Sequence, residues 1–188
     1  MKISSNPENK FVTDFSMYEV IGFHGTTELA CQLIEDKGFL PDKVFPELVH
    51  DDIRGAARLL DINTSDYDQW LEMRSVTFAQ EAAAAINHIT TGNAGGQGLK
   101  NMAIVLEGVL RHGDDRQKSL ACKHVEQIER IRQANAVVYA VNLSGLGQRL
   151  VKDPYQPFYQ FYWNPNLPLP ALSEIGSSRL IERLSIHR

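Results

Sequence analysis

The stretch from Val20 to Gly38 limits the possible folds of this chain most, because its pattern changes period in the middle. It begins as a short apolar run, which is typical of a buried strand that ends in a tight turn. After Thr27 the apolar residues recur at helical spacing, and the pattern stops at Gly38, a frequent residue just beyond a helix. The sequence therefore predicts a strand, a turn and a helix, with His24 at the end of the strand.

In this arrangement His24 stands beside Gly25 and the first turn of the helix. Backbone N–H groups there have no partner within the helix, and an imidazole can hydrogen-bond a hydroxyl, so the junction suits a ligand with carbonyl, amide or phosphate groups. Such turns are common, however, and a single histidine in one is more often a structural hydrogen-bonding group. Two later stretches favour the functional interpretation.

Length and composition limit the class of protein. A chain of 188 residues is long enough for one domain with a proper core. Its net charge of −4 argues against a nucleic-acid partner, which needs a dense cationic surface. Cys31 and Cys122 lie in helical patterns without a CxxC partner, so we expect neither a disulfide nor a metal site.

The sequence also bears on where the protein works. No apolar run is long enough to span a membrane, and residues 1–10 lack the apolar centre of a secretory signal. We therefore expect no membrane partner and a monomer in the cytoplasm. Delivery into a host cytosol by a specialised secretion system is an alternative, because such proteins also lack this signal.

A second strand-to-helix unit follows the first. Residues 75–79 favour a strand and residues 81–89 favour a helix. Residues 1–17 form a polar N-terminal leader that is expected to order only by packing onto the rest of the chain. The glycines between residues 92 and 98 indicate a flexible loop, which is either a linker or a gate over a substrate.

The remaining chain alternates between helical and strand patterns. Helical spacing is found in the second half of 41–63, over 100–111 (where 103–106 is also compatible with a strand), and from Asp114 or Asp115 to Arg132. The continuous apolar run 136–143 is the clearest strand and should be buried on both faces. Residues 156–170, rich in aromatic residues and proline, indicate an extended segment. We interpret it as an edge of the core rather than a docking surface.

The third informative stretch is at the end of the chain. Glu174 lies between Leu172 and Ile175, so it is expected to emerge from a strand whose other face is buried. Residues 180–186 form a strand pattern in which Arg183 and Ser185 are expected to face outward. A single glutamate is usually a surface residue, so only its neighbours give Glu174 a functional interpretation.

Taken together, these three stretches resemble the ADP-ribosyltransferases of the diphtheria-toxin and exotoxin A type, whose fold is shared with the poly(ADP-ribose) polymerases. The family's first motif is an aromatic–His–Gly–Thr run, which Phe23–Thr26 reproduces. Val76–Ala79 is similar to the second motif, a strand end before a helix. Leu172–Ile175, followed by the strand pattern 180–186, is similar to the last. The motifs occur in the family's order and span most of residues 20–186.

The resemblance implies an α+β fold, namely an ADP-ribosyltransferase-like split β-sandwich with flanking helices. Residues 18–188 would form a single domain with a helical insertion at about 100–133. It also implies NAD as the co-substrate and no metal. Glu174 takes the catalytic position, and the NAD-binding positions hold His24, Gly25, Thr26, Thr77, Phe78, Ala79 and His88.

The roles of these residues follow from the resemblance. His24 would hydrogen-bond the adenosine-side ribose, and the Gly25 backbone would pair with the nicotinamide amide, where a side chain would block close approach. Glu174 would accept a hydrogen bond from the ribose 2′-hydroxyl and stabilise an oxocarbenium-like transition state.

The chain departs from the family in two places. The family carries two tyrosines that stack on the nicotinamide ring, and those positions hold Thr77 and His88 here. His88 keeps a planar ring that can stack, whereas Thr77 does not. Arginine-modifying relatives carry a second glutamate two residues before the catalytic one, where this chain has Leu172. We therefore expect the protein acceptor not to be modified at an ordinary arginine.

Three functions remain open. The first is transfer of ADP-ribose from NAD to a protein acceptor, as in a bacterial toxin or effector. The second is NAD hydrolysis at the same site, with water as the acceptor. The third is a catalytically degenerate binding module that kept the fold. The missing tyrosines favour the third function, whereas the pairing of His24 with Glu174 favours the first two.

Overall fold

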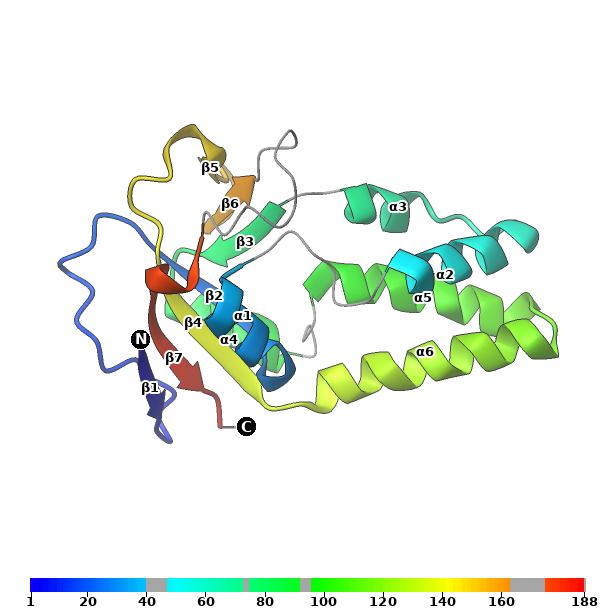
Figure 1. The fold of residues 1–188 in the computed structure, drawn as a ribbon, viewed down its shortest axis with the longest axis horizontal. Coiled ribbons are helices and arrows are strands. Elements are labelled where there is room, and N and C mark those ends of the chain that lie inside the picture. The colour runs from blue at the N-terminus through cyan, green and yellow to red at the C-terminus, as the bar shows by residue number, and fades with distance from the viewer. Residues whose placement is uncertain (40–46, 73–74, 92–95, 163–174, 188) are drawn as a thin grey trace. The chain divides into compact units, whose positions relative to one another are not determined.

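The computed structural model describes residues 1–39, 47–72, 75–91, 96–162 and 175–187 (Figure 1). Within these ranges the chain forms one mixed sheet of seven strands and six α-helices. The predicted α+β class is confirmed at this level. The chain divides into two compact units, which are Met1–Pro41 with Arg74–Ala94 and Ala134–Arg188, and Asp42–Met73 with Gly95–Gln133.

The sheet belongs to the first unit, and its strands lie in the order β1-β7-β4-β2-β3-β6-β5. β1 and β7 are parallel, and all other neighbours are antiparallel. The strands are β1 (Lys2–Ser5), β2 (Ile21–Thr27), β3 (Ser75–Ala79), β4 (Ala136–Asn142), β5 (Leu150–Lys152), β6 (Phe158–Tyr162) and β7 (Leu180–Ser185). The helices of this unit are α1 (Cys31–Lys37), α4 (Ala82–Thr90) and the 3-10 helices η1 (Glu28–Ala30), η2 (Gly147–Arg149) and η4 (Ser177–Arg179).

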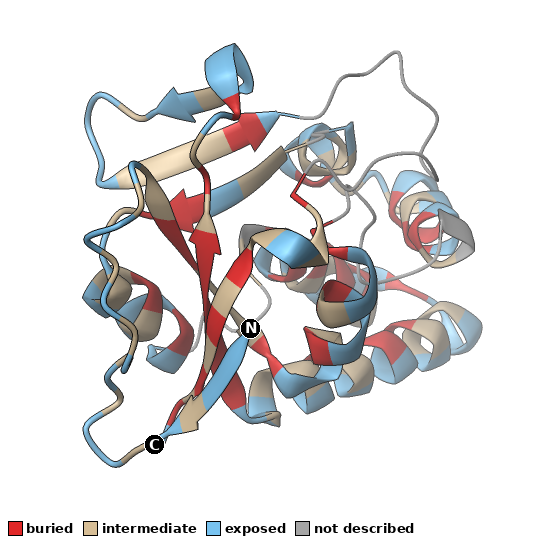
Figure 2. Ribbon diagram, turned by 60° about the vertical axis from the view of Figure 1, so that its left-hand side comes forward, coloured by how far each residue is buried: buried red, intermediate tan, exposed pale blue. Residues whose placement is uncertain are grey.

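β4 is the centre of this unit. Residues 136–141 of β4 are all buried, and Figure 2 shows buried residues along the central strands. Because successive side chains of a strand point to opposite faces, apolar groups must cover both faces of the sheet here. The strand predicted over 136–143 is confirmed.

Two apolar clusters cover the two faces of the sheet. Phe78 and Tyr139 belong to the cluster on the face that α1 covers, which we call the α1 face. Phe23 and Val138 belong to the cluster on the opposite face, which α4 covers and which we call the α4 face. The strand-to-helix pattern at 75–89 is confirmed, because β3 leads directly into α4.

The sheet is almost divided between β2 and β3. β2 and β4 share seven residue pairs and β3 and β6 share five, whereas β2 and β3 share only Phe23↔Ala79. A four-stranded part, β1-β7-β4-β2, is therefore joined to a three-stranded part, β3-β6-β5, through one residue pair.

The turn predicted at His24 and Gly25 is wrong. β2 continues through both residues to Thr27, which pairs with Ala136, and η1 separates the strand from α1. His24 therefore lies in the middle of a strand and not beside a helix N-terminus. The reason is that pairing with β4 along the whole strand outweighs the local turn preference of the glycine.

The second unit is helical. It contains α2 (Glu47–Leu59), α3 (Ser65–Glu72), α5 (Gly96–His112) and α6 (Asp115–Gln133). The helices predicted over the second half of 41–63, 100–111 and 114–132 are confirmed as α2, α5 and α6. The insertion expected at about 100–133 corresponds to α5 and α6, which share a core with α2 and α3 around Ile53, Met102 and Ile128.

Two other segments are described only in part. Of the glycine-rich loop expected over 92–98, residues 92–95 lie outside the described residues, and Gly96–Gly98 begin α5. Of the aromatic segment 156–170, β6 is the extended strand that was expected, and residues 163–170 lie outside the described residues.

Candidate functional site

His24 projects from β2 onto the α1 face of the sheet. Its ring contacts Phe39 and Phe78 edge-on, at centroid distances of 4.8 and 5.7 Å. Its Nδ1–H donates a hydrogen bond of 3.0 Å to the backbone carbonyl of Thr77 on β3. With Nδ1 as the donor, the neutral ring presents Nε2 as an acceptor.

The surroundings of His24 keep its ring neutral. Burial lowers the pKa of His24, and the nearby His88 lowers it further when protonated. The hydrogen bond to Thr77 acts in the opposite direction, yet the pKa stays below its ordinary value. At neutral pH His24 is therefore an uncharged acceptor at Nε2, which suits a hydroxyl donor.

Gly25 presents its backbone on the side of β2 away from β4. Hydrogen bonds between Val20 and Leu143 and between Glu28 and Asn135 show that the even-numbered residues of this stretch bond to β4. In an antiparallel ladder the alternate residues direct N–H and C=O to the other side. Gly25 is one of these, and the structure describes no strand residue paired with it there.

The missing partner of Gly25 is Thr77. Extending the register from Phe23↔Ala79 would place Gly25 opposite Thr77. The Thr77 carbonyl instead accepts the imidazole N–H of His24, and no further β2–β3 pair forms. Two neighbouring residues, His24 and Gly25, therefore offer hydrogen-bonding groups at the point where β2 and β3 separate. These groups are Nε2 of His24 and the backbone N–H and C=O of Gly25.

A side chain at residue 25 would collide with α4. A Cβ atom there would lie 3.0 Å from the Ala85 carbonyl oxygen and 3.4 Å from Cβ of Ile89. The glycine thus allows α4 to pack closely on β2. This packing role is additional to the close approach of a ligand that the sequence resemblance implies.

The other expected NAD-binding residues differ in their surroundings. Phe78 is fully buried beneath His24, and Ala79 is buried on the α4 face. Thr26 pairs with Val137, so its backbone belongs to the ladder with β4. These three residues support the site from within the sheet.

Thr77 and His88 are both exposed. Thr77 contributes its carbonyl to His24, whereas His88 lies on α4, near enough for its charge to affect His24. The structure thus brings His24, Gly25 and Thr77 together on β2 and β3, whereas His88 is linked to His24 through its charge alone.

Glu174 lies outside the described residues. The next residue, Ile175, is fully buried, and its carbonyl accepts a hydrogen bond of 2.9 Å from the N–H of Phe39. The ring of Phe39 in turn contacts His24. Phe39 therefore connects Ile175, the residue that follows Glu174, with His24.

Sequence reasoning missed Phe39. It follows Gly38, which adopts a positive φ of 79°, and a Cβ on Gly38 would lie 2.2 Å from the Ile175 carbonyl oxygen. The only local signal for Phe39 was the preceding glycine, which indicates that the chain changes direction after the helix. It does not indicate which aromatic ring Phe39 contacts.

A polar network on the α1 face was also missed. Glu35 on α1 accepts hydrogen bonds from the Tyr139 hydroxyl (2.8 Å) and from Arg183 (2.6 Å). Burial and hydrogen bonds with Cys31 and Glu35 raise the pKa of Tyr139 well above its ordinary value, so this hydroxyl remains protonated. The prediction that Arg183 faces outward is wrong, because only 22% of its side chain is exposed.

Within the described ranges, no group of three or more His, Cys, Asp or Glu side chains is arranged to hold a metal ion. None of the helices described here is both long and apolar enough to cross a membrane. No family model, curated protein or solved structure matches the chain.

Proposed function

We propose that this protein is an NAD-dependent mono-ADP-ribosyltransferase that transfers ADP-ribose from NAD to a protein acceptor. One observation carries the proposal: a neutral His24, oriented by the Thr77 carbonyl, adjoins the backbone of Gly25, to which the described strands give no partner on the β3 side. The acceptor nitrogen of His24 suits a hydroxyl of the adenosine-side ribose of NAD, and the N–H and C=O of Gly25 suit the carboxamide of its nicotinamide.

In this proposal the Gly25 N–H donates to the carboxamide oxygen of nicotinamide, and the Gly25 C=O accepts from its NH₂ group. His24 Nε2 accepts a hydrogen bond from a ribose hydroxyl. The resemblance implies that NAD lies in a cleft between two packed sheets. The described strands form one continuous sheet, and its narrow junction of one residue pair between β2 and β3 is the feature that supports such a division.

The reaction needs stabilisation of positive charge at the ribose C1′ atom. The bond from C1′ to nicotinamide breaks, nicotinamide leaves with the electron pair, and the acceptor nucleophile bonds C1′ and loses a proton. The transition state resembles that of glycoside hydrolysis. We assign Glu174 to this step, as an acceptor for the 2′-hydroxyl and as a negative charge close to the developing cation.

Thr77, at the position of one of the family's two tyrosines, favours weak NAD binding. His88 on α4 offers one ring to nicotinamide, whereas Thr77 offers none. This feature supports the second candidate, a binding module that kept the fold but not the turnover. NAD hydrolysis is a variant of the first candidate, in which water replaces the protein acceptor.

Release of nicotinamide from NAD tests the proposal. Purified protein should release nicotinamide, and Glu174→Gln should lower the rate at least about 100-fold, because it removes the charge while keeping the shape. NAD affinity, measured by calorimetry, should stay within about threefold of the wild type. Glu19→Gln, at an exposed glutamate, is the matched control and should leave both values unchanged.

Each result separates the candidates. Transfer of labelled ADP-ribose to a protein band in a cell lysate identifies a transferase, and Glu174-dependent release without labelling identifies a hydrolase. NAD binding without release, with and without lysate, identifies the binding module. Failure of NAD to bind would contradict all three.

A further inference from the structure

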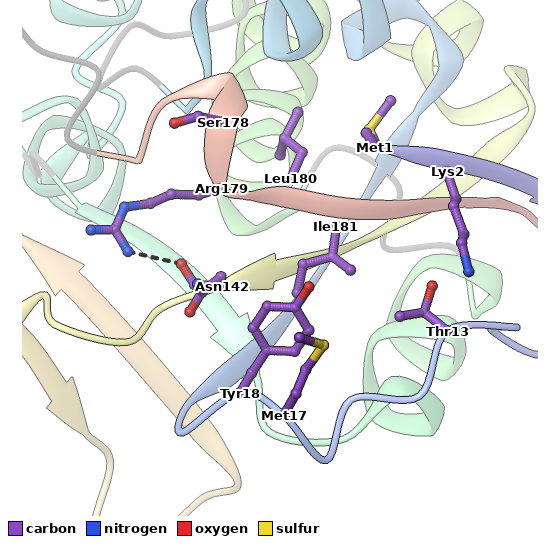
Figure 3. Close-up of a pocket in the computed structure, with 10 residues that line it drawn as sticks. All are labelled: Met1, Lys2, Thr13, Met17, Tyr18, Asn142, Ser178, Arg179, Leu180 and Ile181. Atoms are coloured by element: carbon purple, nitrogen blue, oxygen red, sulfur yellow. Dashed lines mark hydrogen bonds between the residues drawn. The ribbon is translucent and has the colours of Figure 1, made fainter.

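A pocket of about 460 Å³ lies on the first unit, away from His24. Its walls come from the start of β1, the segment 13–18, the end of β4, and the junction of η4 with β7. Pockets that bind small molecules in proteins have about this size. Figure 3 shows Tyr18, Met17 and Ile181 gathered in it, with Lys2 and Arg179 reaching it from opposite ends of the view.

The charged side chains of this pocket are both cationic. Arg179 donates hydrogen bonds to the backbone carbonyls of Asn142 (3.1 Å) and Ser144 (2.9 Å), so its guanidinium is held in place without a neutralising carboxylate. Among the described residues, neither Lys2 nor Arg179 forms an ion pair, and no acidic side chain lines the pocket. In a chain of net charge −4, this pocket is a local site of positive charge.

The rest of the lining is mostly apolar. Met1, Met17, Leu180 and Ile181 contribute apolar surface, and the two methionines remain 50% and 78% exposed. Methionine side chains are flexible and adapt to irregular apolar ligands. The hydroxyl of Tyr18 adds a hydrogen-bonding group beside this surface.

We propose that this pocket binds a small organic anion, a carboxylate or a phosphate monoester carried on an apolar body. The head group would take a charge-assisted hydrogen bond from Lys2, and the charge of Arg179, which Asn142 and Ser144 hold at the other end of the pocket, would add to the attraction. The body would lie against the methionines and Ile181. Neither inorganic phosphate nor a neutral apolar compound alone uses both halves of this lining.

The pocket is separate from the candidate NAD site. None of the residues that line the pocket contributes to the His24 site. The two proposals therefore stand or fall independently.

Methionine methyl signals report on the pocket directly. The chain has four methionines, of which Met1 and Met17 line the pocket, whereas Met102 is fully buried in the second unit. Full-length protein labelled with [methyl-¹³C]methionine is titrated with octanoate, octyl phosphate, octanol and inorganic phosphate. Octanoate or octyl phosphate should move the Met1 and Met17 signals saturably and leave the Met102 signal in place. The tighter of the two identifies the head group.

Substitution of Lys2 tests the charge. Lys2→Gln should weaken the tighter-binding anion about tenfold, because it removes a charged hydrogen-bond donor. Lys2→Arg should keep the affinity. Lys10→Gln, at an exposed lysine of the same N-terminal segment, is the matched control and should have no effect.

Three outcomes would overturn the proposal. The first is no saturable shift with either anion, and the second is octanol or inorganic phosphate binding as tightly as the anions. The third is an unchanged affinity in Lys2→Gln, provided that its unliganded Met1 and Met17 signals match the wild type. If those signals differ, Lys2→Arg decides. Retained affinity of this variant for the anion supports a role for the positive charge at residue 2, and lost affinity contradicts it.

Discussion

One histidine changes the hydrogen bonding between two strands. His24 bonds the Thr77 carbonyl through its side chain, so the backbone of Gly25 lacks the partner that the β2–β3 register would provide. The same bond selects the tautomer with Nε2 as acceptor. Both features on which the proposed NAD binding rests therefore depend on this one side chain.

Acidification should weaken NAD binding through His24. The pKa of His24 in the folded protein is lowered. The contribution of neutral His24 to the stability of the fold is therefore fully present above the ordinary pKa of about 6.5 and is lost as the pH falls through the lowered folded value. Protonation also removes the acceptor at Nε2. Calorimetry from about pH 8 to about pH 5 should therefore show a falling NAD affinity. His24→Gln should abolish this dependence, and its persistence would point to His88 instead.

Gly25→Ala should destabilise the first unit. The new methyl group would lie 3.0 Å from the Ala85 carbonyl oxygen, so α4 must shift. We expect a loss of about 1–3 kcal/mol in the free energy of unfolding, measured with urea. Gly55→Ala in α2, where nothing lies within 4 Å, is the control and should stabilise by about 0.5–1 kcal/mol. Equal effects at the two positions would contradict the packing argument.

Residues were easier to predict from the sequence than their partners. His24 and Gly25 stood out because an aromatic–His–Gly–Thr run is a local pattern. The partners of Glu35 are 104 and 148 residues away in the chain, and no local pattern reports such a contact. The conformation of His24 was also missed, since the turn preference of one glycine competes with a ladder that only the folded sheet provides.

At the level of elements, the N-terminal segment is held by one buried carboxylate. Glu182 on β7 accepts hydrogen bonds from the Ser4 hydroxyl (2.5 Å) and from the backbone N–H groups of Val12 (3.0 Å) and Thr13 (2.9 Å). The same segment places Phe11 and Phe15 against Phe23. The polar leader is thus ordered by the pairing of β1 with β7, by one anion and by two aromatic rings.

Glu182→Gln should release this segment. Replacing the carboxylate by an amide weakens the charged hydrogen bonds and places an NH₂ group against the N–H of either Val12 or Thr13, at a cost of about 2–3 kcal/mol. Hydrogen exchange at those two amides should accelerate. Glu8→Gln, in an exposed pair with Lys10, is the matched control and should leave the exchange rates unchanged.

The same contact should weaken in acid. Burial raises the pKa of Glu182, but the hydrogen bonds from Ser4, Thr13 and Val12 outweigh it, so the folded pKa is lowered. The stabilisation is therefore present above the ordinary carboxyl value and is lost as the pH falls through the folded one. In Glu182→Gln, exchange at residues 12 and 13 should no longer follow this acid dependence.

Long periodic elements were predicted, whereas the shortest strands were not. The helices at 100–111 and 114–132 and the strand at 136–143 have continuous patterns, and α5, α6 and β4 confirm them. β1 and β5 have four and three residues, too few for a period to appear. They are strands because β7 and β6 provide hydrogen-bonding partners.

At the level of the whole molecule, each unit has its own apolar core. The sheet unit has one cluster on each face, and the helical unit has a third around Met102. Both units are formed from separate stretches of sequence, so local pattern alone does not show which helices belong together. For this reason the sequence indicated a helical insertion at 100–133 but not its shared core with α2 and α3.

Met102→Ala should affect the helical unit selectively. Met102 is fully buried, and its truncation should cost about 2–5 kcal/mol. Hydrogen exchange should accelerate in α5 and remain unchanged in β4, because separate cores unfold separately. Ile104→Ala, at a side chain that is 58% exposed, is the control and should change α5 little. Equal acceleration in β4 would show that the two units unfold as one.

The single residue pair between β2 and β3 has a mechanical consequence. When force is applied between β4 and β6, the seven pairs of β2 with β4 and the five of β3 with β6 share the load, whereas between β2 and β3 it falls on Phe23↔Ala79 and the His24–Thr77 hydrogen bond. Under tension the sheet should therefore rupture first between β2 and β3.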